Sequence, residues 1–478
     1  MRDKTIKAVP LQRETVGIPV LLSVGLGTFM SALDASVVNT VLPVIRVAYR
    51  APVESIQWVA TTYLLVMGGL LLTFGRLGDL RGHKRSYLGG FGVFLPASVL
   101  CGISTTVEML IAARVLQGIG AAILVSNSPA ILIGSVHPLR LGQALGLQAS
   151  MTSLGLALGP SLGGWLTDQF GWRAIFFMNV PVGTVAFLLG LRHITRDAHP
   201  PAPDERFDNA GAFLFLGAFL ALQFVLTGGN AWGWGSPWTI GLFAFSAALG
   251  FLFLRQERNA RSPMLDLTLF RNRLFSFAAG SALVNYVCMA GVLFLVPFYL
   301  IQGRGLSASR AGIIMTIQFL VMVVTAPVSG RISDRIGSRV PATTGMAVTA
   351  VGLFLLSAMN GDSPLRLTVA GLIVTGVGMA IFVTPNNSEM LGAAPKGRKG
   401  IASGVLATSR LVGMATGVGL AGAILVGFVG HRADHGLPPD RLYQAVHFEF
   451  FAAGSMAIGG IFLTAARGRR RPGLSISP

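Results

Sequence analysis

The sequence predicts an all-α protein that crosses a membrane many times. Of its 478 residues, 52% are hydrophobic and only 12% are charged, whereas a soluble domain carries about 25% charged residues. The mean hydropathy is +0.66. The apolar residues form long runs, and ~20 of them in a row suffice to cross a bilayer as a helix. These runs lack the alternation of apolar and polar residues that is typical of outer-membrane barrel strands.

Fourteen apolar runs are long enough to be spans, and an even number places both termini on one side of the membrane. We expect them near 17–44, 54–75, 85–104, 108–134, 141–165, 172–192, 209–229, 236–255, 274–301, 309–330, 340–358, 366–391, 400–427 and 443–466.

The basic residues set the predicted orientation. With a cytoplasmic N-terminus, 27 Lys and Arg residues fall in inside segments and 8 in outside segments, and Arg114 and Arg410 lie within spans. Cytoplasmic loops of membrane proteins carry such an excess, so we expect a bacterial cytoplasmic-membrane protein with both termini inside. The net charge of +18 then faces anionic lipid headgroups, and no nucleic-acid partner is expected.

The chain resembles itself at an offset of 254–258 residues, which indicates a duplication of a six-helix unit in one orientation. We therefore predict an N-terminal bundle (1–195), a two-helix insertion (196–262), and a C-terminal bundle with a basic tail (263–478). The matching stretches are "GRLGDLRGHKR" (75–85) with "GRISDRIGSRV" (330–340), "GIGAAILV" (118–125) with "GVGMAIFV" (376–383), 142–164 with 400–422, and Pro43 with Pro297.

Asp34, in "SALDASVVNTVLPVI", is the only charged residue between Val16 and Ile45. A carboxylate at the centre of a span costs roughly 2.5–3.5 kcal/mol. By helical rise it lies ~25 Å along the first span, and Arg114 lies ~10 Å below the outer end of its own span. The two residues therefore have similar depths and are expected to interact directly or through water. The alternatives are a structural hydrogen bond for Asp34 and a snorkelling side chain for Arg114.

The loop "GRLGDLRGHKR" combines spaced glycines, an acid and basic residues. Gly75 permits close helix approach, Gly82 turns the chain, and Asp79 accepts hydrogen bonds from a helix N-terminus or a basic side chain. The basic residues Arg81, Lys84 and Arg85 face the cytoplasm, and Asp334 repeats Asp79 in the second half. The alternative is a loop whose basic residues only set the topology.

The stretch "GLALGPSLGG" places Gly155, Gly159 and Gly163 at intervals of four residues, on one helix face that allows close backbone packing. Pro160 bends the helix and frees a carbonyl, and Gly164 follows. The alternative is a plain packing face of small residues, which would need this spacing but not the proline.

These stretches, together with "RVLQGIGAA" around Arg114, resemble the fourteen-helix drug/proton antiporter branch of the major facilitator superfamily, the multidrug resistance exporter type. The resemblance covers nearly the whole chain. It implies two six-helix bundles that rock about a central cavity, a conformational latch in "GRLGDLRGHKR", and an exporter motif in "GLALGPSLGG". It implies proton coupling at Asp34 and Arg114. Where the family often has a basic residue after the latch acid, this chain has Leu80, so Arg81 is expected to substitute.

Polar residues within spans are candidate cavity residues: Asn39, Tyr63, Gln117, Asn285, Tyr286 and Arg410. Glu108 and Glu449 are near outer span ends, where we expect them to be hydrated. We expect Asp34→Asn to fold at least as well as the wild type, because it removes a costly charge.

The expected function is proton-coupled export of small amphipathic or lipophilic, often cationic, drugs by a monomer, with the proton as coupling ion and no cofactor. The sequence holds no nucleotide, zinc-protease or nucleophile-elbow motif, and Cys101 and Cys288 lie in apolar runs, so an enzyme and a metal site are not expected. The alternatives are an exporter of lipid-like molecules, siderophores or a self-made antibiotic, and, less favoured, a proton symporter for nutrient uptake. A receptor or channel fits the duplication poorly.

Overall fold

The computed structural model describes residues 17–136, 141–195, 208–260, 265, 267–393, 399–430 and 438–467, and these residues contain helices and no strand. The helices are Ile18–Tyr49 (α1), Val53–Arg81 (α2), His83–Gly102 (α3), Val107–Ser135 (α4), Leu141–Phe170 (α5), Ala174–Phe177 (α6), Asn179–His193 (α7), Asn209–Trp232 (α8), Pro237–Asn259 (α9), Leu267–Arg271 (η2, 3₁₀), Arg273–Phe298 (α10), Tyr299–Gly303 (η3, π-helical), Ala308–Ile336 (α11), Arg339–Ser357 (α12), Leu365–Ala393 (α13), Lys399–Val429 (α14) and Pro439–Ala465 (α15).

The all-α polytopic fold is confirmed, and a long helix occupies each of the fourteen predicted spans. The sixth span begins with the short α6 and continues as α7. Twelve of the described helical segments are long and apolar enough to cross a membrane, and α3 and α5 are the two spans outside that set. The helix α3 begins with His83, Lys84 and Arg85, which lower its hydropathy.

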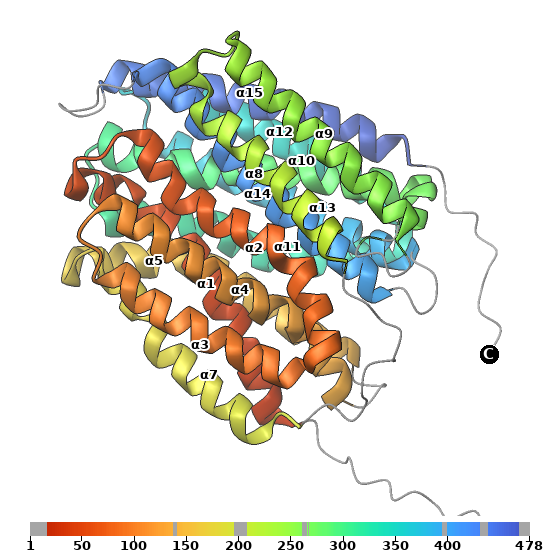
Figure 1. Cartoon of the computed structure of the whole chain (residues 1–478). Helices are drawn as coiled ribbons and strands as arrows, with labels where there is room; N and C mark the ends of the chain where they lie inside the picture. The colour runs from red at the N-terminus through yellow and green to blue at the C-terminus, as the bar shows by residue number, and fades with distance from the viewer. Residues whose placement is uncertain are drawn as a thin grey trace, which may run out of the picture.

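The two halves of the chain lie side by side (Figure 1). Helices α1–α7, red to yellow, form one side, and α10–α15, green to blue, form the other. Across the seam α5 packs on α11, α2 on α14, and α1 on α10. Because fourteen helices cross the molecule, residues 17 and 467 belong to the same end of the bundle, called here the terminal end; the opposite end is the distal end.

The inserted pair lies across this seam. Helix α8 packs against α2 of the first half and α14 of the second, and α9 packs on α8. Gln223 of α8 donates from Nε2 to Thr416 Oγ1 of α14 at 3.5 Å. The predicted divisions at 195/196 and 262/263 fall at or within segments outside the described residues, and they stay predictions.

Hydrogen bonds join the two halves at the distal end. Gln302 donates from Nε2 to the carbonyl of Pro43 at 3.1 Å, and Gln57 donates to the carbonyl of Gly419 at 3.1 Å. The backbone N–H of Ser309 donates to Asp168 at 3.0 Å. The distal ends of α1, α2 and α5 are therefore tied to the opposite half.

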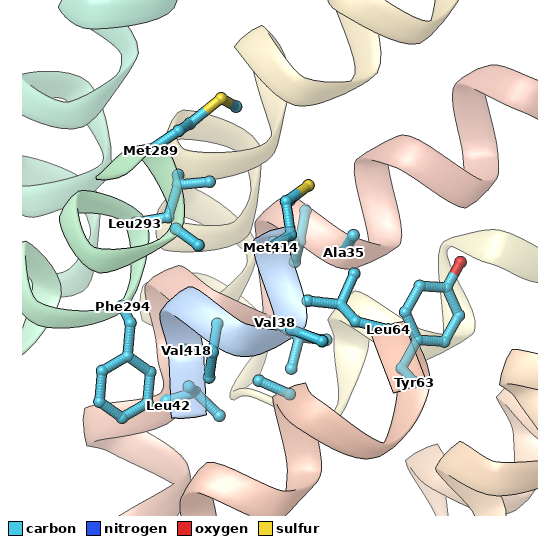
Figure 2. Packing of buried hydrophobic residues seen from close by; sticks show 14 of the residues in the cluster. Ala35, Val38, Leu42, Tyr63, Leu64, Met289, Leu293, Phe294, Met414 and Val418 are labelled. Carbon is cyan, nitrogen blue, oxygen red and sulfur yellow. The ribbon is translucent and has the colours of Figure 1, made fainter. Parts of the chain in front are cut away.

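A layer of apolar side chains closes the seam between these helices (Figure 2). These side chains are at most 8% exposed and come from four helices: Ala35, Val38 and Leu42 of α1, Leu64 of α2, Met289, Leu293 and Phe294 of α10, and Met414 and Val418 of α14. We call this set the apolar seal. Because these side chains are buried, they exclude water from this part of the seam.

The glycines of α5 allow two close helix contacts. A Cβ atom at Gly155 would lie 2.5 Å from the carbonyl oxygen of Phe29, and one at Gly159 would lie 2.5 Å from Cβ of Ser36. Both contacts are with α1. Pro160 and Gly164 instead face α11, where the carbonyl of Pro160 abuts Gly312. Helix α5 is thus wedged between α1 of its own half and α11 of the other.

We expect Gly159→Leu to lower the folded yield and the melting temperature in detergent, because a branched side chain has no space against Ser36 of α1. Overpacking of this kind typically costs about 1–3 kcal/mol. Gly146→Leu is the matched control, since no atom lies within 4 Å of the position of its Cβ on the same helix. Equal yields for the two variants would show that α5 does not need this close approach.

Candidate functional site

Asp34 lies at the centre of a buried polar cluster inside the first half. Five helices supply its members, and the side chains named here are at most 2% exposed. The Asp34 cluster consists of Asp34 (α1), Tyr63 (α2), Ser98 (α3), Arg114 and Gln117 (α4), and Asn179 (α7).

The Asp34 carboxylate accepts hydrogen bonds from three side chains. Oδ2 forms an ion pair with Nη1 of Arg114. Oδ1 accepts from Nε2 of Gln117 at 2.9 Å and from Nδ2 of Asn179 at 2.8 Å. Such charge-assisted hydrogen bonds are the strong ones in proteins, so the carboxylate is compensated by one cation and two amides.

The guanidinium of Arg114 has three further partners besides Asp34. Nη1 donates to Oε1 of Gln117 at 2.6 Å, and Nε donates to the carbonyl of Val59 at 3.1 Å. Its central carbon lies 4.1 Å from the ring centroid of Tyr63, a cation–π contact. Tyr63 in turn donates from its hydroxyl to the carbonyl of Ser31 at 2.9 Å.

Ser98 orients the two amides that hold Asp34. Its Oγ accepts from Gln117 Nε2 at 3.0 Å and from Asn179 Nδ2 at 3.0 Å, and it donates to the carbonyl of Phe176 at 3.1 Å. Both amide groups therefore use both N–H bonds, one on the carboxylate and one on the hydroxyl.

The cluster faces the interior of its own half, away from the apolar seal. Ala35 and Val38 of α1 belong to the seal (Figure 2), whereas the adjacent Asp34 is directed to α4 and α7. A buried ion pair is tolerable only while both partners remain, because removal of one leaves an uncompensated charge. Loss of the negative charge of Asp34 alone would therefore leave the guanidinium of Arg114 as an unbalanced buried cation.

The structure brings Asp34 and Arg114 together, but it does not place the candidate cavity residues at an open surface in this conformation. Tyr63 and Gln117 belong to the Asp34 cluster, Asn39 donates to the carbonyl of Ala35 at 2.8 Å, and Asn285 is fully buried. Tyr286 is 7% exposed and lies within electrostatic range of the half-buried Arg410.

The stretch predicted as a latch forms the turn between α2 and α3. Gly82 has φ +95°, which favours glycine, and it ends α2. Lys84 donates to the carbonyl of Leu191 at 3.1 Å, within its own half. The side chain of Asp79 lies outside the described residues.

The other basic and acidic residues of the predicted latch, Arg81, Arg85 and Asp334, are exposed at the terminal end. Gly75 packs against α4: a Cβ atom added at Gly75 would lie 3.7 Å from the Cβ of Ser126. The latch role of this stretch stays a prediction.

Sequence reasoning missed Ser98 and Asn179, because a lone small polar residue in a span gives no motif. It also misjudged Glu449. That residue was expected to be hydrated near an outer span end, but it is 5% exposed, because α15 turns it toward α10. Glu108 is exposed, as expected.

A second buried ion pair lies at the terminal end of the second half. Arg467, just after α15, pairs with Glu389 of α13 at 2.8 Å and donates to Ser281 and Asn386. Across the residues that the structure describes, no group of three or more His, Cys, Asp and Glu could hold a metal ion.

The geometry reverses the expected effect of Asp34→Asn on folding. The amide would leave Arg114 buried without a counter-charge, and breaking a buried pair in this way costs about 3–5 kcal/mol. We expect Asp34→Asn to lower the melting temperature in detergent. The double variant Asp34→Asn/Arg114→Gln, which removes both charges, should recover most of the loss. A single variant as stable as the double variant would contradict the ion pair.

Comparison with known proteins places the chain in a family. The sequence model of the family described as "Major Facilitator Superfamily" matches residues 24–273 and 274–477. Among curated proteins, the chain is 34% identical over 450 residues to "Multidrug resistance protein Stp" of Mycobacterium tuberculosis, covering 92% of this chain and 83% of that protein.

Two further relatives carry different names. "Riboflavin transporter RibZ" of Clostridioides difficile is 32% identical over 93% of this chain and 96% of its own length. "Tetracenomycin C resistance and export protein" of Streptomyces glaucescens is 33% identical over 86% of this chain and 76% of its own length.

Solved structures share the fold at low identity. A bacterial homologue of the human lysosomal transporter Spinster, in an inward-facing conformation, superposes with a TM-score of 0.66 at 16% identity, over 95% of this chain and 96% of that chain. A POT family transporter in complex with a thioalcohol-conjugated peptide superposes with a TM-score of 0.69 at 12% identity, over 92% of this chain and 94% of that chain.

Proposed function

The chain belongs to the major facilitator superfamily and is a multi-pass membrane transporter, and from this we propose that it exports small amphipathic or lipophilic compounds in exchange for protons. The observation that carries the proposal is the Asp34 cluster. A carboxylate and a guanidinium lie buried together inside the bundle, although a pair of apolar side chains would cost less there. A group that must gain and lose charge explains the presence of this pair.

In the proposed cycle Asp34 binds the coupling proton. Protonation removes the anion that balances Arg114, and the guanidinium keeps its contacts to Gln117, the carbonyl of Val59 and the ring of Tyr63. Asp34 is directly followed by Ala35 of the apolar seal. A change in how α1 packs on α4 and α7 is thereby transmitted to the contact between α1 and α10.

The distal end is the extracellular end in the predicted orientation, with both termini in the cytoplasm. The apolar seal and the hydrogen bonds of Gln57, Gln302 and Ser309 then close the outer side of the seam. We propose that these contacts break when the bundles rock to release the substrate outward, with no cofactor and with the monomer as the working unit.

The substrate class rests on the relatives. One apolar cavity of about 150 Å³ lies beside the inserted pair, toward the terminal end, where Phe215, Phe253 and Leu283 are among its lining residues. A drug-sized ligand needs roughly 300–1,000 Å³, so this cavity is too small to hold one in the conformation seen here. Relatives named for multidrug resistance and tetracenomycin export favour export of such molecules.

A second candidate is a transporter of one polar aromatic compound. It is favoured by the relative named a riboflavin transporter, which matches nearly the whole chain. A self-made antibiotic, a siderophore or a lipid-like molecule as cargo would keep the same fold and site, and uptake by proton symport would reverse the direction.

Expression in an efflux-deficient bacterium tests the proposed function. We expect resistance to part of a panel of lipophilic compounds, abolished by an uncoupler of the proton gradient and lost in Asp34→Asn/Arg114→Gln. This double variant is chosen because it leaves no unpaired charge. Glu108→Gln, an exposed acid on α4, is the matched control and should retain resistance. Resistance that persists with the uncoupler, or in the double variant at equal membrane level, would contradict proton coupling.

The latch role makes a separate prediction. Asp79→Lys should insert normally and slow transport several-fold. Reversing the charge near the end of α2 would weaken the proposed latch contact, which the transporter forms again in each cycle. Asp362→Lys, an exposed acid in the connection between α12 and α13, is the control for added positive charge. Transport by Asp79→Lys at the rate of this control would remove the latch from the proposal.

A further inference from the structure

Glu449 is a buried acid to which the proposed cycle gives no role. It lies ten residues after the start of α15, ~15 Å along the helix by rise, and is 5% exposed. A carboxyl at that depth is costly to ionise.

The carboxyl fills the space that a glycine leaves open. Oε1 of Glu449 is the nearest atom to the position that a Cβ of Gly291 would occupy on α10. One turn further along α15, the carbonyl of Ala453 accepts from Sγ of Cys288 at 3.4 Å. Within the described part of the chain, no hydrogen bond or ion pair to Glu449 is found.

Among the described side chains of the surrounding helices, no cation is found that balances Glu449. Helices α10, α12, α14 and the π-helical η3 pack against α15, and the group that faces Glu449 from them is the Cys288 thiol. The other described titratable groups have partners elsewhere. The side chains of Tyr299, Tyr443 and His447 bond the carbonyls of Asn360, Gly303 and Ser357. Arg441 donates to the carbonyl of Phe428, and Arg339 to that of Ala465 at the terminal end. Arg410 lies within electrostatic range of Tyr286, and Asp440 lies in the first turn of α15.

The repeat relates this position to the Asp34 cluster. At the offset that pairs Pro43 with Pro297, Asp34 corresponds to Cys288. In each half the last helix supplies the polar side chain beside that position, Asn179 from α7 and Glu449 from α15. The buried acid of the second half therefore lies on a different helix of its bundle from the one that carries Asp34 in the first half, and Leu372 occupies the position that corresponds to Arg114.

Glu449 also lies directly behind the apolar seal. Met289 and Leu293 of α10 belong to the seal (Figure 2), and Gly291 between them is turned about 200° from Met289 around the helix, toward α15. A change in the charge of Glu449 would therefore act on the packing of the same helix segment that closes the seam.

We propose that Glu449 is a second proton-binding site, in the half of the protein that lacks the Asp34–Arg114 pair. Its carboxyl holds a proton while α10 and α15 are packed as seen here, and releases it when the seal opens and water reaches it. The only bond that forms and breaks at this site is the O–H bond of the Glu449 carboxyl, so each cycle would exchange one more proton. Its part in transport rests on the proposed function, but its ability to bind a proton does not.

Infrared difference spectroscopy of the purified protein in lipid nanodiscs tests the site without any substrate. The C=O stretching band of a protonated carboxyl lies at a different frequency from the bands of a carboxylate, and this frequency shifts in D₂O. We expect the wild-type protein to show such a band at neutral pH, Glu449→Gln to lose it, and Glu449→Asp to keep a displaced one. Glu108→Gln is the matched control and should match the wild type. An unchanged band in Glu449→Gln would overturn the proposal.

Proteoliposomes test the coupling, with tetraphenylphosphonium and the compounds from the resistance screen as probes. We expect Glu449→Gln to release fewer protons per substrate than the wild type and to show a flatter pH dependence of transport, with Glu449→Asp restoring part of both. The same proton count as the wild type would overturn the coupling role of Glu449. If the wild-type protein itself moves no protons with any probe, the proposed function fails, and the infrared result still decides the site.

Discussion

The buried ion pair between Asp34 and Arg114 is the constraint on which the first half depends. Burial of either charge without the other costs about 3–5 kcal/mol, and neither group is satisfied by its partner alone. Gln117 and Asn179 complete the coordination of the carboxylate, and Ser98 fixes those amides. Because these groups come from α1, α3, α4 and α7, with Tyr63 and a carbonyl of α2 on Arg114, the cluster requires five helices to hold one arrangement.

The second half keeps the helical scaffold of the duplication but distributes its charges differently. The positions corresponding to Asp34 and Arg114 are Cys288 and Leu372. Its buried pair, Arg467 with Glu389, lies instead at the terminal end, where it ties the end of α15 to α10 and α13 through Ser281 and Asn386. One half therefore has its paired charges near the seal, and the other has an unpaired acid there, Glu449. The two halves therefore differ in how their buried acids are balanced near the seal.

The seam between the two halves combines close helix contacts at small residues with buried apolar side chains. Gly155 and Gly159 bring α5 against α1, and Pro160 and Gly164 bring it against α11. The apolar seal contributes burial without geometric demands, since hydrophobic contact is non-directional. A few hydrogen bonds, such as that of Gln302 to the carbonyl of Pro43, fix the register. Contacts of this kind can separate without leaving a buried charge unpaired, whereas separation of the Asp34 cluster would leave one.

The sequence by itself determined the fold class and the positions of the fourteen spans. A membrane span must be a helix that satisfies its own backbone hydrogen bonds, so it must be long and apolar, and both properties can be read from the sequence. It also determined that Asp34 and Arg114 lie at similar depth, since helical rise converts residue number into distance. Only the tertiary structure decided which way each side chain points. Rotation about a helix axis depends on packing between helices, and nearly uniform apolar sequences record it weakly. For that reason Ser98 and Asn179 were found only in the structure, Glu449 proved to be buried, and the burial of Arg114 reversed the expected effect of neutralising Asp34.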